Sequence, residues 1–215
     1  MSGPVGRRTP RIADLVFRPL TPDLWGRFAD WFGSPDSSSD ARWCWCAFWR
    51  QRGIDWSNST PESNRALLRG LAEREGPAPG LVALRGDRAV GWVSVGPRET
   101  YDRLEHSRVL ARVDDRPVWS IVCFVVARSE RGRGVATALL DAAVAYAREH
   151  GATLVEAYPA DTAGGRIPAA SAYGGPLSMF QRAGFELAAT RRANAAARPR
   201  AIVRRELEGT PGESA

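Results

Sequence analysis

Two arginines and two glycines alternate at residues 131–134, directly before a segment with the spacing of a helix. Glycine lets the backbone approach a ligand closely, and the N–H groups of a first helical turn have no partners inside the helix. Anions bind well at such a turn, and Arg131 and Arg133 add positive charge. The pattern predicts a site for a phosphate or pyrophosphate.

The segments on either side of this turn are those that such a site needs. The apolar run from Val118 to Val126 is rich in β-branched residues, which is typical of a strand buried on both faces. The segment from Thr137 to Arg148 gathers its alanines and leucines on one broad face, as in an amphipathic helix packed on a sheet. The order of strand, glycine turn and helix would hold the anion site in place.

Together these residues resemble the acyl-CoA-binding motif of the GNAT superfamily of N-acyltransferases. That motif reads Arg/Gln-x-x-Gly-x-Gly/Ala and occurs here as Arg131-x-x-Gly134-x-Ala136. Downstream, residues 179–185 are similar to the helix-to-strand signature that closes the GNAT core. The resemblance covers about residues 13–208 and implies the GNAT version of an α/β (α+β) fold. This fold has a mixed central sheet of about six to seven strands, flanked by helices, with splayed central strands.

The resemblance also implies how the donor binds. In GNAT enzymes the central strand parts from the next one, and the pantetheine arm of acetyl-CoA adds to its edge through backbone hydrogen bonds. Acetyl-CoA is therefore the expected co-substrate, and no metal is expected. The expected contacts are on the central strand and the turn: Phe124, Val125, Val126, Arg131, Gly132, Arg133, Gly134, Val135 and Ala136.

An aromatic segment after the first predicted helix contains Trp43, Trp45 and Trp49. In GNAT proteins this region usually builds one wall of the acceptor site, where aromatic faces could receive a flat or cationic amine. Packing in the core is the alternative. Glu105, in a probable helix or lid over residues 101–110, is a further candidate to bind an ammonium group, although such charges also form solvated faces.

Catalysis needs a base that takes a proton from the acceptor amine. Some relatives carry a carboxylate on the central strand where this chain has Ser120, which cannot serve alone at neutral pH. Glu156 interrupts the apolar run of the next strand, and a glutamate in the matching pattern of some relatives is the base. Glu156 is therefore the predicted general base, acting through a water. An ion pair with an arginine such as Arg166 is the alternative.

The CoA thiolate is helped to leave by an acid. Many relatives supply a tyrosine from the last helix, at the position of Phe180, which has no proton to give. Tyr173 is the predicted acid, and Tyr158, water or unaided departure of the thiolate are the alternatives. Tyr173 lies in a glycine-rich segment, residues 159–175, that is expected to form a movable flap over the acceptor.

The composition is that of one soluble cytoplasmic domain between two disordered ends. A chain of 215 residues that is 44% hydrophobic can bury one substantial core. No apolar run approaches the ~20 residues that span a bilayer, and the basic N-terminus lacks the apolar core of a signal peptide. Residues 1–12 are expected to form a basic arm and residues 209–215 a tail. Cys44, Cys46 and Cys123 are too few for a disulfide framework, and the first two are too close for a structural zinc site.

All 30 basic side chains are arginine, and the formal net charge is +6. This charge favours anionic ligands such as the phosphates of CoA. No basic-aromatic motif accompanies it, so nucleic acid is not the expected partner. The predicted function is transfer of an acetyl group from acetyl-CoA to a primary amine of a small molecule or peptide, by a monomer or homodimer.

Two alternatives to this function stay open. A module that binds acyl-CoA without turning it over would keep the glycine turn but lack a base and an acid, and Phe180 in place of the tyrosine favours it. A nucleic-acid- or ribosome-associated acetyltransferase would use the arginine-rich ends of the chain, and its RNA binding would be sensitive to salt.

Overall fold

The computed structural model describes residues 12–159 and 173–207. Its elements, in chain order, are η1 (Ile12–Asp14), β1 (Leu15–Pro19), α1 (Pro22–Phe32), α2 (Ser39–Cys44), α3 (Gly53–Ser57), α4 (Pro61–Ala72), β2 (Gly80–Arg85), β3 (Arg88–Pro97), η2 (Arg98–Thr100), α5 (Asp102–Glu105), β4 (Trp119–Val126), η3 (Arg128–Glu130), α6 (Val135–Glu149), β5 (Leu154–Ala157), α8 (Leu177–Arg182), β6 (Glu186–Arg191) and β7 (Arg200–Glu206).

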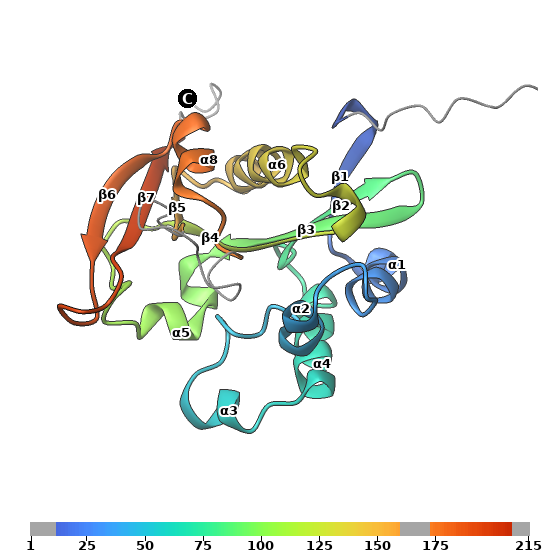
Figure 1. Ribbon diagram of the computed structural model, residues 1–215, viewed down its shortest axis with the longest axis horizontal. Helices are drawn as coiled ribbons and strands as arrows, with labels where there is room; N and C mark the ends of the chain where they lie inside the picture. The colour runs from blue at the N-terminus through green and yellow to red at the C-terminus, as the bar shows by residue number, and fades with distance from the viewer. Residues whose placement is uncertain (1–11, 160–172, 208–215) are drawn as a thin grey trace, which may run out of the picture.

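The strands form one seven-stranded sheet in the order β1-β2-β3-β4-β5-β7-β6 (Figure 1). β4 and β5 pair in parallel, and every other neighbouring pair is antiparallel. Helices cover both faces: α6 and α8 lie on one face of the sheet, and α1 to α5 lie on the other (Figure 1). The predicted mixed sheet flanked by helices is confirmed.

β4 lies in the middle of this sheet, and its sequence suits that place. All of its side chains except that of Val126 are buried, because helices cover both faces and leave no polar side of the strand.

On one face of the sheet, α6 packs closely against β3 at Gly91. A Cβ atom there would lie 2.9 Å from the Leu139 side chain and 3.1 Å from that of Val135. The absence of a side chain therefore brings the helix that follows the glycine turn directly onto the sheet.

The N-terminal arm and the expected helix or lid have other bounds than the sequence predicts. Ile12, expected to belong to the N-terminal arm, forms part of η1, and the helix expected over residues 101–110 ends at Glu105. Residues 1–11, 160–172 and 208–215, which include Arg166 and most of the expected arm, flap and tail, lie outside the described residues. None of the described helices combines the length and the apolar character needed to cross a membrane.

Candidate active site

The two central strands part beside the predicted donor site. β4 pairs with β5 only over residues 119–121, whereas its antiparallel pairing with β3 continues to Val126. Beyond Ile121 the edge of β4 that faces away from β3 has no partner strand within residues 12–159 and 173–207. One group on this edge is occupied, because the backbone N–H of Phe124 donates to the carbonyl of Tyr173 at 2.7 Å. The predicted splay of the central strands is confirmed.

The glycine turn joins β4 to α6 in a conformation that needs glycine. Gly132 and Gly134 have φ angles of +72° and +81°, in the left-handed region that side chains disfavour. Gly134 is the N-cap of α6 and has no side chain to cap the helix. Ala138 is the residue whose N–H reaches back to the Gly134 carbonyl, at 3.0 Å. The N–H groups before it are those that a helix leaves unpaired, so they can bind an anion.

Arg131 anchors this turn rather than only adding charge to it. Its Nε donates to the Val126 carbonyl and its Nη2 to the Ser37 carbonyl, both at 3.3 Å. These bonds tie the turn to the end of β4 and to the loop before α2. Arg131 and Arg133 are both exposed, so their positive charge still faces an anion at the turn.

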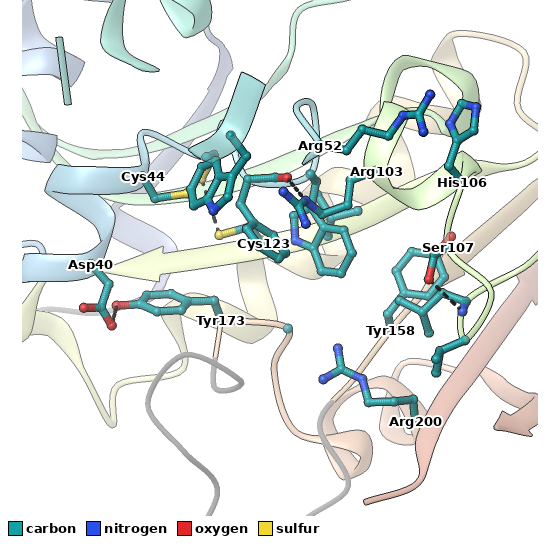
Figure 2. Close-up of a pocket in the computed structure, with 18 of the residues that line it drawn as sticks. Asp40, Cys44, Arg52, Arg103, His106, Ser107, Cys123, Tyr158, Tyr173 and Arg200 are labelled. Carbon is teal, nitrogen blue, oxygen red and sulfur yellow. Dashed lines mark hydrogen bonds between the residues drawn. The ribbon is translucent and has the colours of Figure 1, made fainter. Parts of the chain in front are cut away.

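A cavity of about 1130 Å³ opens beside the unpaired part of β4 (Figure 2). Val122, Cys123 and Val125 from β4 line one side of it. The other sides come from segments far apart in the sequence: α2 with the loop after it, α5 with the loop after it, Tyr158, Tyr173 and the connection between β6 and β7. A ligand that lay along this edge of β4 would therefore be in contact with a second molecule bound in the cavity.

Two of the three predicted wall tryptophans line the cavity, and the third does not. Trp43 and Trp49 are among the lining residues. Trp45 is only 5% exposed, and its left-handed backbone (φ 45°) at the end of α2 turns the chain. Its ring lies 5.2 Å from Phe32 and 6.1 Å from Trp25 between ring centroids. The prediction for Trp45 is corrected: it is a core residue, as the packing alternative expected.

Glu156 is fully buried in a network of hydrogen bonds. Its Oε1 accepts from Arg98 Nη1 at 2.6 Å and from Tyr158 Oη at 2.5 Å, and its Oε2 accepts from Arg204 Nε at 2.7 Å. Ser120, also buried, places its Oγ 2.9 Å from Tyr158 Oη. Of these residues, Tyr158 is the one that lines the cavity. Glu156 is thus a partner in a buried ion pair, and among its hydrogen-bond partners Tyr158 is the residue that connects it to the cavity lining.

Glu105 does not line the cavity, which corrects its predicted contact with the acceptor. It accepts hydrogen bonds from Arg98 Nε at 2.6 Å and Arg112 Nη2 at 2.7 Å. Burial by itself raises the pKa of Glu105, but the bonds from Arg112 and Arg98 outweigh it and hold this pKa below its ordinary value. Both arginines lie outside the cavity lining, so Glu105 stabilises the loop after α5 instead of binding a ligand.

Tyr173 lines the cavity with its hydroxyl group at the start of α2 (Figure 2). Its Oη lies 2.8 Å from Ser38 Oγ and donates to Asp40 Oδ2 at 3.3 Å. Burial raises the pKa of Tyr173 despite the bond to Ser38, so the hydroxyl keeps its proton at neutral pH. For Tyr158, burial and the carboxylate beside it raise the pKa well above its ordinary value. Of the two tyrosines, Tyr173 therefore keeps a pKa nearer to the ordinary value of a phenol.

The three cysteines line the cavity as free cysteines. Cys46 Sγ donates to Cys123 Sγ at 3.4 Å and accepts from Trp92 Nε1 at 3.0 Å. Burial raises the pKa of Cys44 to about 12. Over residues 12–159 and 173–207, no three His, Cys, Asp or Glu side chains come together as a metal site would require.

Three arginines that no sequence motif marks lie in or beside the cavity. Arg98 is fully buried and also donates to the carbonyl of Leu110 at 2.7 Å. Arg103 and Arg200 line the cavity. No sequence signal separates them from the other arginines, because the groups that surround them come from distant parts of the chain.

Comparisons with known proteins agree with this geometry. The family model described as the acetyltransferase (GNAT) family matches residues 41–173, and no curated protein matches the chain. Among solved structures, the Drosophila melanogaster polyamine N-acetyltransferase, described as catalysing the formation of N-acetylagmatine, is 14% identical with a TM-score of 0.56, over 90% of this chain and 100% of its own.

Two bacterial structures match to a similar extent. The structure described as histone acetyltransferase HPA2 and related acetyltransferase, from Corynebacterium glutamicum, is 17% identical with a TM-score of 0.54, over 92% of this chain and 99% of its own. A GNAT family acetyltransferase from Streptococcus pneumoniae is 14% identical with a TM-score of 0.51, over 90% of this chain and 99% of its own. At these identities the structures establish the fold. The family model spans more than half of the 215 residues, so the chain belongs to the GNAT acetyltransferase family and is an acyltransferase.

Proposed function

We propose that this protein moves an acetyl group from acetyl-CoA to a primary amine of a small molecule or peptide by direct attack. GNAT enzymes use acetyl-CoA as co-substrate. The observation that carries the proposal is the edge of β4 beyond Ile121, which has no partner strand among the described residues, lies beside the cavity and ends at the glycine turn. A donor laid along this edge would have its thioester near the cavity and its phosphates near α6.

The main chain of β4 and the turn would hold the donor. Since the Phe124 N–H points away from β3, the N–H of Val126, two residues on, points to the same side. The N–H of Val126 can bond to a pantetheine arm that adds to the strand edge, which leaves the N–H of Phe124 for the thioester carbonyl. The pyrophosphate would lie at the N–H groups of residues 132–136. Val125 contributes its side chain to the cavity.

The reaction needs one bond formed, one bond broken and one proton moved. The amine nitrogen attacks the thioester carbonyl carbon, the carbon–sulfur bond breaks, and the sulfur takes a proton as the amine loses one. The N–H of Phe124 would stabilise the negative charge on the carbonyl oxygen. Tyr173 would protonate the sulfur, and Asp40, the carboxylate that accepts from Tyr173, would take up the amine proton.

Glu156 remains part of the proposal in a restricted form. Because two arginines and Tyr158 occupy its oxygens, it would act on the acceptor only through the Tyr158 hydroxyl group. Its simpler role is to hold Tyr158 against the cavity. A Glu156→Gln variant separates the two roles: a loss of stability indicates the structural role, and a loss of kcat in a stable protein indicates a role in proton transfer.

The wall of the cavity supports an amine acceptor of moderate size. Trp43 and Trp49 present their rings there, together with Phe48 and Trp56. Trp43 and Trp56 pack edge to face, with ring centroids 4.9 Å apart. A flat aliphatic or aromatic body fits such a surface. The polyamine and agmatine acetyltransferases among the structural neighbours share this fold, and their acceptors are one class to test.

The direct test is the release of free thiol from acetyl-CoA in the presence of a panel of amines, with calorimetry of acetyl-CoA binding. Gly134→Glu adds a negative side chain where φ is +81° and should abolish acetyl-CoA binding. Gly70→Glu, at an open position in α4, is the matched control and should leave binding unchanged. Unaltered affinity in a folded Gly134→Glu variant would contradict the assignment of the turn, and donor binding without thiol release would favour a non-catalytic module.

A further inference from the structure

The cavity beside β4 is lined by more positive than negative charge. Its carboxylate among the described residues is Asp40. The acidic residues nearby are paired with arginines: Asp102 with Arg52 at 2.8 Å, and Glu105 and Glu156 with partners outside the lining. A polycationic acceptor therefore meets little negative charge. The arginines that line the cavity are Arg52, Arg103, Arg198 and Arg200.

Arg103 is held in place through its Nε, and its buried nitrogen Nη2 has no partner among the described residues. Its Nε donates to the carbonyls of Phe48 and Gln51 at 2.7 and 2.8 Å, and its guanidinium lies 4.1 Å from the centre of the Phe48 ring and 5.6 Å from that of Trp56. Its Nη2 is buried and bonds to none of the described residues. A buried donor without a partner is unfavourable, and a ligand acceptor atom would satisfy it.

Arg200 reaches into the cavity from β7. Its side chain extends toward the space between Tyr173 and Tyr158 (Figure 2). Over residues 12–159 and 173–207 its guanidinium makes no hydrogen bond or ion pair, and burial lowers its pKa. Burial of a charge without a counter-ion is costly, so a bound anion would be stabilised here strongly.

These arginines are separate from the expected site of the CoA phosphates. The turn residues Arg131 and Arg133 do not line the cavity, and Arg103 and Arg200 do. We propose that the acceptor amine also carries a carboxylate, as an amino acid does, and that Arg103 and Arg200 bind this carboxylate. The inference rests on the proposed acetyl transfer. A planar guanidinium matches a carboxylate through two parallel hydrogen bonds, and the aromatic wall at Trp56 can contact the apolar part of the acceptor.

The test compares amines that differ only in the carboxylate: arginine with agmatine, ornithine with putrescine, and phenylalanine with phenethylamine. Thiol release from acetyl-CoA gives kcat/KM for each, and calorimetry on the CoA-loaded protein gives the affinity. We expect kcat/KM to be about tenfold or more higher for the carboxylated member of at least one pair, the effect of one charge-assisted hydrogen bond.

The two amines of a pair also differ in basicity, which by itself can change kcat/KM. Variants of the cavity arginines therefore test whether a preference for the carboxylated amine depends on these arginines. Arg200→Gln and Arg103→Gln should bring the ratio of kcat/KM within a pair toward that of the free amines, and loss of folding in one variant leaves the other informative. Arg182→Gln, on α8 and exposed, removes the same charge outside the cavity and should keep the wild-type ratio.

Two results would overturn the inference. Acetylation of the panel without a carboxylate preference, or with a preference that both cavity variants retain, would refute it while acetyl transfer stands. No thiol release and no acceptor binding with any amine would refute the proposed function, and this inference with it.

Discussion

Replacement of Glu156 by glutamine should reduce stability more than it reduces acetyl transfer. Glutamine keeps one acceptor oxygen but places an NH₂ group against a guanidinium, so the positive charges of Arg98 and Arg204 lose their buried partner. Breaking a buried ion pair from one side costs about 3–5 kcal/mol of unfolding free energy. In a domain of this size about 1 kcal/mol lowers Tm by roughly 2–4 °C, so Tm should fall by about 10 °C.

The matched control is Glu206→Gln on the neighbouring strand β7. Glu206 also pairs with arginine, accepting two hydrogen bonds from Arg116 at 2.7 and 2.6 Å, but its side chain is 67% exposed. Exposed ion pairs contribute about 0–1 kcal/mol, so the free energy of unfolding of this variant should be close to that of the wild type. Urea unfolding followed by circular dichroism gives both free energies, and thiol release below the lower Tm gives kcat.

The opposite pattern would refute this reasoning. If Glu156→Gln unfolds within about 1 kcal/mol of the wild type and kcat falls by about two orders of magnitude, Glu156 is the base that its place in the sequence suggests. The network around it would then be preserved by the amide, and Glu105 and Asp114 would be the carboxylates that still pair with Arg98 and Arg204.

Three further changes probe other parts of the site. Tyr173→Phe removes the proposed acid and should lower kcat by roughly a hundredfold with unchanged calorimetric affinity for acetyl-CoA; unchanged kcat would remove Tyr173 from the chemistry. Trp45→Ala should cost about 3–5 kcal/mol of unfolding free energy, whereas Trp49→Ala should mainly raise the KM of the acceptor, and equal losses of stability would contradict this division. Glu105 has a pKa held below its ordinary value, so the stability that it confers is complete above pH 4.5 and is lost as the pH falls through the lower folded-state pKa; urea midpoints measured from pH 7 to 3 should fall less steeply for Glu105→Gln than for the wild type.

The sequence predicted the sheet and the glycine turn because both depend on local patterns. The apolar run into β4 and the two glycines of the turn specify a strand, a left-handed turn and a helix within about thirty residues, and the periodicity alone distinguishes them. The same holds for the antiparallel strands β2 and β3, which the turn at Gly86 and Asp87 joins. These parts of the fold need no knowledge of distant contacts.

The charged residues of the site could not be predicted in the same way. Arg98 binds Glu156 across 58 positions of sequence, and no local pattern shows that this pair forms. The expected ion-pair partner of Glu156 was a flap arginine, while the structure supplies arginines from η2 and β7. Trp45 was grouped with its aromatic neighbours because the left-handed turn that buries its ring depends on the packing of α1 and α2. Burial and charge pairing are properties of the assembled fold, so the surroundings of these residues could be known only from the structure.

The contact between Tyr173 and β4 sets a condition on how the donor arrives. In the protein without ligand the Phe124 N–H already has an acceptor, the Tyr173 carbonyl at 2.7 Å. Acetyl-CoA would therefore exchange one hydrogen bond for another at this position instead of gaining a new one. The measured affinity would equal the intrinsic affinity multiplied by the fraction of molecules in which the contact is open. A change that weakens the hold on Tyr173, such as loss of the hydroxyl of Ser38, would then tighten donor binding without any new contact to the donor.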